Sequence, residues 1–137
     1  MDCAARPYAY VIDLLKTAGI RPTRQRLSLA KLLFEGGHKH VTAESLFELC
    51  VHEHETVSLA TIYNSLHQFK EAGLLREITL GTGKTYYDTN MEPHYHFYHV
   101  HDERLEDIEA KNIKLSGLPD MPQGTKLSHI DVVLYVD

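Results

Sequence analysis

The feature that most constrains this sequence is a change of pattern near residue 88. Before it, apolar residues recur at helical spacing, and ten Lys and Arg residues nearly balance nine Asp and Glu residues. After it, short β-prone runs follow one another, and ten acidic residues outnumber four basic ones. Because helices and strands bury their apolar faces with different periods, the change predicts two domains. We assign residues 1–87 to the first domain, residues 88–93 to a hinge and residues 94–137 to the second.

The first domain contains four segments with helical periodicity. The first segment has apolar residues at i, i+3, i+4 and i+7 and ends at Gly19, and the second covers residues 23–34. Residues 38–40 are expected in the loop after the second helix. Thr42 and Ser58 are typical N-cap residues, so we expect a third helix after Thr42 and a fourth over residues 59–72. The expected buried stripe of the fourth helix consists of Leu59, Ile62, Leu66 and Phe69.

The expected outer face of the fourth helix is polar but uncharged. Its members are Thr61, Asn64, Ser65 and Gln68. An ordinary exposed helix usually carries Glu/Lys pairs on such a face. Small hydrogen-bonding side chains instead suit a helix that approaches base edges in a major groove. For this helix taken alone, an ordinary surface face explains the pattern equally well.

A predicted β-hairpin follows the fourth helix. Two β-prone runs, residues 75–79 and 84–88, flank a turn that contains Gly81 and Gly83. Three helices, a polar-faced fourth helix and a hairpin follow each other in the order of a winged helix-turn-helix, which predicts DNA binding. Arg24 and Lys84, the latter at the hairpin tip, are the candidates for phosphate contacts. The candidates for groove contacts are Ser58, Thr61, Tyr63 and Asn64, although packing is an alternative role for Tyr63.

The second domain is predicted to contain three strands, at residues 94–101, 104–109 and 126–136. Three short strands bury little surface, so a second copy of the chain is the natural way to complete the core. Dimerisation also suits the first domain, because paired helix-turn-helix units read two half-sites of double-stranded DNA. The predicted fold class is therefore α+β, with an N-terminal winged helix-turn-helix domain followed by a small α/β dimerisation domain.

Metal-ligating residue types are concentrated around the hinge. His94 and His96 flank one residue, so on a strand both imidazoles point to the same face. Asp88 lies six residues upstream of His94 and can offer a carboxylate to the same point. Two imidazoles and a carboxylate suit zinc, iron or manganese better than calcium or magnesium. The alternative is a polar strand whose histidines face water.

Three further histidines of the second domain stand apart from this cluster. His99 and His101 have the opposite strand parity to His94 and His96, so they cannot join the same site unless the strand bulges. His129, in the last part of the chain, is the third of these histidines.

Other sequence features exclude broad classes. The two cysteines, Cys3 and Cys50, are too few for a disulfide framework and lack Cys-x-x-Cys spacing. No apolar run reaches the roughly 18 residues of a membrane helix, and the N-terminus has no export signal. We therefore expect a reduced, cytoplasmic protein with no membrane partner.

Several motifs occur in a characteristic order and carry a family resemblance. They are Gly19-Ile20-Arg21-Pro22-Thr23-Arg24-Gln25-Arg26, His40-Val41-Thr42-Ala43-Glu44, Ser58-Leu59-Ala60-Thr61-Ile62-Tyr63, Gly73-Leu74-Leu75 and His94-Tyr95-His96. In these motifs, which span most of residues 6–110, the chain resembles the ferric uptake regulator family. The resemblance implies a metal-responsive, dimeric repressor with an N-terminal winged helix and a C-terminal dimerisation domain.

The resemblance also implies one regulatory site per subunit for a divalent metal, which would be zinc, iron or manganese. The family's ligand positions fall on His40, Asp88, His94 and His96. Asp107 stands where an aspartate adds a fifth ligand in the peroxide-sensing branch of the family. A metal held by ligands from both domains would clamp them in one relative orientation and shift the population toward the DNA-binding form.

The chain also departs from the family pattern. The cysteine pairs that hold structural zinc in many members are absent, and Pro93 and Tyr95 occupy positions of a second histidine-rich site. The ending, with residues 115–119 and Val132-Val133, resembles the iron-response regulators of alphaproteobacteria, which answer to haem. If haem is the effector, as this resemblance implies, the candidate axial ligands are His99, His101 and His129. Tyr95, however, interrupts the histidine triplet of that branch, and Cys3 is not followed by its proline.

The sequence therefore predicts a metal-responsive DNA-binding regulator of iron, haem or peroxide-response genes and not an enzyme. One alternative is a metalloenzyme that uses Asp88, His94 and His96 as a facial triad for ferrous iron. No nucleophile, base or cofactor motif accompanies these residues. Another alternative is a metal- or haem-binding protein that does not contact DNA.

Overall fold

A computed structural model describes residues 8–137, so Cys3 lies outside the described part of the chain. The chain forms two compact units, of which the first ends at Met91 and the second comprises Glu92–Asp137. Within residues 8–137, no helix has both the length and the apolar character that crossing a bilayer requires.

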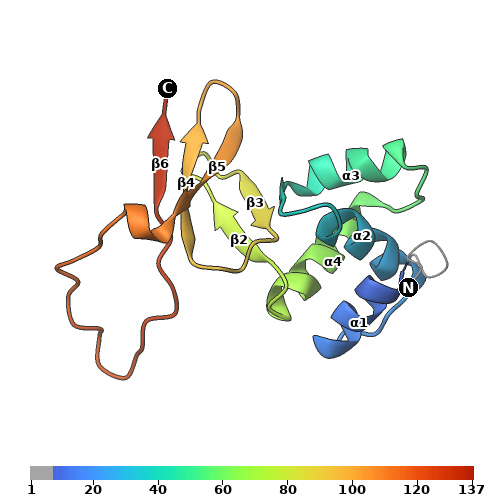
Figure 1. Ribbon diagram of the computed structural model, residues 1–137, viewed down its shortest axis with the longest axis horizontal. Coiled ribbons are helices and arrows are strands. Elements are labelled where there is room, and N and C mark those ends of the chain that lie inside the picture. Colours follow the sequence, from blue (N-terminus) through green and yellow to red (C-terminus); the bar gives the residue numbers. More distant parts are fainter. Residues whose placement is uncertain (1–7) are drawn as a thin grey trace. The chain divides into compact units, whose positions relative to one another are not determined.

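The first unit combines four helices with a small sheet (Figure 1). The helices are α1 (Ala9–Thr17), α2 (Arg24–Phe34), α3 (Ala43–His52) and α4 (Leu59–Glu71). The strands β1 (His40–Val41), β2 (Arg76–Thr79) and β3 (Thr85–Asp88) form an antiparallel sheet in the order β1–β3–β2. The hairpin β2–β3 follows α4 directly, so the predicted order of a winged helix-turn-helix is confirmed.

A single apolar cluster holds the helices of the first unit together. Leu15 of α1, Leu33 of α2, Leu46 of α3 and Phe69 of α4 are fully buried in it. Tyr87 of β3 packs on the same cluster and ties the sheet to the helices. Burying a side chain of this size stabilises a fold by about 1.5–3 kcal/mol.

Hydroxyl side chains begin three of the helices, as the sequence predicts. The hydroxyl oxygens of Thr23, Thr42 and Ser58 accept hydrogen bonds from backbone N–H groups at the starts of α2, α3 and α4. At α3 the arrangement is reciprocal, because the Ser45 hydroxyl also accepts from the Thr42 N–H over 2.9 Å. Such caps satisfy donors that a helix leaves unpaired at its N-terminus.

The end of α3 places a histidine where the neighbouring helices use glycine. After α4, Gly73 has φ +80° and its N–H donates to the Lys70 carbonyl over 3.0 Å. After α3, the same backbone turn is made by His54, with φ +58°, whose N–H donates to the Val51 carbonyl over 3.1 Å. A non-glycine residue in this left-handed conformation costs roughly 1–2 kcal/mol.

Two details of the first unit differ from the expectations. His40 was expected in a loop but belongs to β1, which pairs with β3. On α4, Leu59 was expected to be buried and Ser65 to be exposed, whereas Leu59 is exposed and Ser65 is buried. Ser65 lies three residues after Ile62 and four before Phe69, so it falls within the helix face that contacts the core.

The second unit is a three-stranded sheet in the order β5–β4–β6 (Figure 1). It consists of β4 (His94–His99), β5 (Arg104–Glu109) and β6 (Val133–Val136), with one 3-10 turn, η1 (Ala110–Asn112), after β5. β5 runs antiparallel to β4, and β6 runs parallel to it. Residues 113–132 connect η1 to β6 without a further helix or strand.

Two of the predicted strands are shorter than expected. β4 ends at His99 because the chain turns at residues 100–103, where Glu103 adopts φ +52°. His101 therefore lies in a turn and not on the strand. The last strand covers only Val133–Val136 of the expected residues 126–136.

Candidate metal centre and DNA-binding surface

The first set of metal-ligating side chains lies on paired strands of the first unit. His40 of β1 stands directly opposite Asp88 of β3 in the antiparallel register. The pairing brings the Nε2 atom of His40 to 3.2 Å from Oδ2 of Asp88. Asp88 is fully buried, and a buried carboxylate requires a cation or hydrogen-bond donors.

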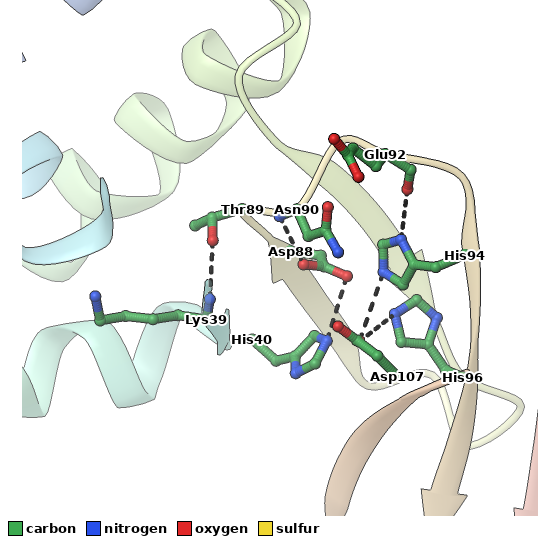
Figure 2. Close-up of polar contacts among 9 residues, drawn as sticks. All are labelled: Lys39, His40, Asp88, Thr89, Asn90, Glu92, His94, His96 and Asp107. Carbon is green, nitrogen blue, oxygen red and sulfur yellow. Dashed lines mark hydrogen bonds and ion pairs between the residues drawn. The ribbon is translucent and has the colours of Figure 1, made fainter. Parts of the chain in front are cut away.

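Local hydrogen bonds hold this first set in place (Figure 2). The Asn90 N–H donates to Oδ1 of Asp88 over 2.9 Å, so one oxygen is held while Oδ2 faces His40. Beside them, the Lys39 N–H donates to the Thr89 hydroxyl over 2.8 Å, and the Thr89 N–H donates to the Lys39 carbonyl over 3.1 Å. These bonds extend the contact between the β1 and β3 ends and fix the spacing of the two ligating side chains.

The second set lies on the paired strands β4 and β5 of the second unit. His94 and His96 share one face of β4, as their spacing predicts, and both are buried. Asp107 of β5 is the register partner of His96. One carboxylate oxygen of Asp107 lies 3.6 Å from Nε2 of His94 and 3.5 Å from Nε2 of His96. The two imidazole nitrogens and the carboxylate thus converge (Figure 2).

The backbone orients the ring of His94. Its Nδ1 atom lies 2.6 Å from the carbonyl oxygen of Glu92, as Figure 2 shows. Because a carbonyl only accepts, Nδ1 donates in this contact, which leaves Nε2, the ring nitrogen on the side of Asp107, as the candidate metal donor. A histidine that donates its other ring N–H in this way is the usual arrangement of a metal ligand.

The donor chemistry of both sets fits a borderline divalent metal. Imidazole nitrogens and carboxylate oxygens are ligands of zinc, iron and manganese. Each set alone offers only two or three protein donors, which is fewer than the four of a structural zinc site. In residues 8–137, no group of three or more His, Cys, Asp or Glu outside these two sets offers ligand atoms at metal-binding distances.

The three candidate haem ligands lie in three different local surroundings. Nε2 of His99 lies 2.7 Å from Oε1 of Glu106 on the paired strand β5. His101 is exposed in the turn after β4, and His129 is exposed in residues 113–132, with its Nε2 atom 3.5 Å from Asp131.

The candidate DNA-binding residues lie on the exposed side of the first unit. Tyr63 and Asn64 are exposed on α4, Ser58 caps that helix, and Thr61 is partly exposed beside them. Arg24 is the first residue of α2, and it lines a groove with residues of α4. The residues lining this groove are Thr23, Arg24, Gln25, Arg26, Thr61, Asn64, Ser65 and Gln68.

Lys84 extends the same candidate surface onto the hairpin. It precedes β3, and its Nζ atom lies 5.3 Å from the centre of the Tyr86 ring. The hydrogen bond from Tyr63 is the main cause that lowers the pKa of Glu44, and the charge of Lys84 lowers it slightly further.

Three residues that contact the candidate metal ligands or the candidate DNA-binding residues were not predicted from the sequence. Glu92 and Asn90 act through backbone atoms, which no side-chain pattern reveals. Glu44 accepts a hydrogen bond of 2.5 Å from the Tyr63 hydroxyl, a contact between α3 and α4 that depends on their packing.

The sequence as a whole carries the signature of a known family. The model of the ferric uptake regulator family matches residues 17–135. This chain belongs to that family. The match covers both candidate ligand sets and every candidate DNA-binding residue.

Similar proteins place this ferric uptake regulator family member among known regulators. The peroxide-responsive repressor PerR of Staphylococcus aureus strain Mu50 is 38% identical over 85 residues, which are 62% of this chain and 57% of that protein. The chain therefore spans just over half the length of that relative. The structure of the Vibrio cholerae ferric uptake regulator is 22% identical in sequence and superposes with a TM-score of 0.72. The superposition covers 91% of this chain and 97% of that one. The Campylobacter jejuni peroxide stress regulator, 26% identical, has a TM-score of 0.59, with 100% of this chain and 96% of that one covered.

These likenesses confirm the predicted α+β fold class and the family to which the sequence motifs pointed. Nothing in them singles out the iron-response branch of alphaproteobacteria.

Proposed function

We propose that this member of the ferric uptake regulator family is a metal-responsive, DNA-binding transcriptional repressor. The observation that carries the proposal is the division of the metal-ligating side chains into two incomplete sets. His40 and Asp88 belong to the first unit, whereas His94, His96 and Asp107 belong to the second. A single ion that takes ligands from both sets would reach the coordination number that neither reaches alone.

The chain itself favours such a joint site. Only five residues separate Asp88 from His94, so their Cα atoms lie within about 20 Å even when the segment is fully extended. The bound zinc, iron or manganese ion would supply a positive charge shared by donors of both units. Residues 88–93 would act as the hinge between a DNA-binding domain, residues 1–87, and a dimerisation domain, residues 94–137.

The proposed response is a shift of population. In the absence of metal, no ion would link the buried Asp88 of the first unit to the two buried histidines of β4, and the proposed hinge alone would connect the units. An ion that binds one relative orientation better than the others raises its population by its differential affinity. The orientation selected in this way is the one in which two copies of the first unit meet successive half-sites of an operator.

DNA contact and dimerisation belong to the same proposal. Tyr63, Asn64, Ser58 and Thr61 would face the bases, and Arg24 and Lys84 would contact phosphates. The second unit would pair with its counterpart in another copy, which would add buried surface to a three-stranded sheet. Such a regulator works in the cytoplasm, where the operator is located. Family membership favours this function over the facial-triad enzyme and over a metal-binding protein without DNA contact.

The test compares DNA and metal binding in one set of proteins. Duplexes enriched from a random library by the wild-type protein in the presence of Mn²⁺ serve as the selected DNA. We expect metal removal to weaken binding to this DNA, and His94→Ala/His96→Ala to abolish stoichiometric metal in native mass spectrometry. Asp107→Asn is a milder variant, since that side chain is 39% exposed, and His38→Ala is the matched control. Unchanged metal content in the double variant, or equal DNA binding with and without metal, would contradict the proposal.

Two resemblances favour different effectors for this repressor. Similarity to PerR and the presence of Asp107 favour peroxide, whereas residues 115–119 and Val132-Val133 favour the haem-linked iron-response branch. We propose metal-level sensing, because it requires no reaction beyond binding. A gain of one oxygen on His40 or His94 after peroxide treatment would favour peroxide sensing instead. A haem spectrum that is lost in His99→Ala/His101→Ala would favour haem.

A further inference from the structure

The contact between Glu44 and Tyr63 places a carboxylate where phosphates are expected. Glu44 lies in the first turn of α3 and is exposed, and its Oε2 atom accepts the hydrogen bond of 2.5 Å from the Tyr63 hydroxyl. Residues 56–70, which include all of α4 except its last residue, Glu71, carry no Asp or Glu of their own. An unpaired negative charge at this surface would only repel DNA.

Glu44 and Tyr63 both lie near helix N-termini that are capped by hydroxyl side chains. Glu44 follows the reciprocal hydrogen bonds of Thr42 and Ser45 at the start of α3. Tyr63 lies in the first turns of α4, whose N-terminus is capped by the Ser58 hydroxyl over 3.1 Å. The hydrogen bond therefore joins two rigid points and restricts a phenol ring that is 46% exposed.

The energetics of the pair agree with a strong contact. The hydrogen bond to Glu44 is the main cause that raises the pKa of Tyr63, and the same bond is the main cause that lowers the pKa of Glu44. At neutral pH the carboxylate is thus ionised and the phenol protonated. Hydrogen bonds with one ionised partner are shorter and about twice as strong as neutral ones.

We propose that Glu44 is a positioning residue that sets the DNA sequence specificity of the protein by holding the Tyr63 ring in its groove-facing orientation. This inference rests on the proposed DNA-binding function and adds a residue to it. Glu44 has two effects on binding: its charge repels every duplex equally, and its hydrogen bond favours only the duplex that Tyr63 fits. The specificity ratio rises only through the hydrogen bond, because a repulsion that is equal for every duplex cancels from the ratio.

The proposal predicts effects of opposite sign for two kinds of DNA. In Glu44→Ala, loss of the charge should strengthen binding to both duplexes equally, whereas loss of the hydrogen bond should weaken binding to the selected duplex alone and by the larger amount. A good base contact corresponds to a discrimination of roughly 5- to 150-fold, so we expect the specificity ratio to fall by about 5-fold or more. Glu44→Gln keeps an acceptor oxygen and should strengthen random binding while it largely restores the ratio.

A double-mutant cycle tests whether the two residues act together. The dissociation constants of wild type, Glu44→Ala, Tyr63→Phe and the double variant are measured by fluorescence anisotropy on both duplexes at one salt concentration. If the hydrogen bond positions the ring, Glu44→Ala should cause no further loss of ratio in the Tyr63→Phe background. Glu53→Ala, which removes a carboxylate at the other end of α3, is the charge-matched control and should leave the ratio unchanged.

Two measurements separate positioning from a change of fold. Ultraviolet titration, taken as the difference between a protein and its Tyr63→Phe counterpart, should show that Glu44→Ala lowers the pKa of Tyr63. Circular dichroism should show unchanged helix content. The inference is overturned if Glu44→Ala strengthens binding to both duplexes equally, or if the losses of Glu44→Ala and Tyr63→Phe are additive. Failure of the wild type to enrich any duplex would instead overturn the proposed function.

Discussion

Replacement of Asp88 by Asn offers a sharp test of the metal centre, because the two carboxylate oxygens have different tasks. Oδ1 accepts the Asn90 N–H over 2.9 Å, and an Asn side-chain oxygen can accept the same bond. Oδ2 faces His40 over 3.2 Å, and there the variant loses both the negative charge and the preferred metal donor. Asp88→Asn should therefore preserve the local fold while it disrupts metal binding.

The magnitude follows from linkage between binding and folding. A metal at 100 times its dissociation constant stabilises the folded protein by about 2.7 kcal/mol. If loss of the carboxylate raises that constant about 100-fold, the same metal concentration contributes only about 0.4 kcal/mol. The metal-linked gain in unfolding free energy should thus fall by about 2.3 kcal/mol.

The assay is urea unfolding followed by circular dichroism at 222 nm, with chelator and with Mn²⁺. The four α-helices of residues 8–137 all lie in the first unit, so this signal reports the unit that contains Asp88. In chelator, Asp88→Asn should resemble the wild type, whereas Asp88→Ala should lose about 1–3 kcal/mol, because the Asn90 N–H loses its acceptor. Full metal-linked stabilisation in Asp88→Asn would refute the assignment of Asp88 as a ligand.

Three further outcomes are expected. Lys84→Ala should weaken binding to selected and random duplexes alike and reduce the salt slope of log K by about 1, as measured by anisotropy at several salt concentrations. His54→Gly should raise the unfolding free energy by up to about 1 kcal/mol in urea, because glycine adopts the φ of +58° without strain. The pKa of Tyr63 is raised in the folded state, so its contribution to stability should be complete below pH 10 and lost as pH rises further. The difference in unfolding free energy between wild type and Tyr63→Phe, followed from pH 8 to 11, measures that loss.

Much of the first unit was predictable because its signals are local. Thr42 and Ser58 mark helix starts by residue type alone, and both cap helices at those positions. The reversal of Leu59 and Ser65 has a geometric reason, since both lie at the margin of the buried face of α4. Which margin is covered depends on the packing of neighbouring helices, and that information is not contained in the helix's own sequence.

The candidate ligands divide in the same way. His94 and His96 share a face because two residues on one strand obey the strand period. The pairing of His40 with Asp88 depends instead on a two-residue strand whose partner lies 48 positions away, and no local pattern announces such a contact. His40 entered the ligand set only through resemblance to the family. The turn that removes His101 from β4 was equally hidden, because it depends on the left-handed conformation of Glu103.

Strand β3 is a rigid connection between two chemically different ends. It begins next to Lys84 at the hairpin tip and ends at Asp88, and four residue steps at about 3.3 Å each span roughly 13 Å. β2 pairs with all four residues of β3 and β1 pairs with the last two, so these pairs resist bending of β3 relative to its neighbours. A displacement of the carboxylate would consequently be transmitted to the hairpin as motion of the whole strand. A shift of Asp88 on metal binding would thus also move Lys84 at the hairpin tip.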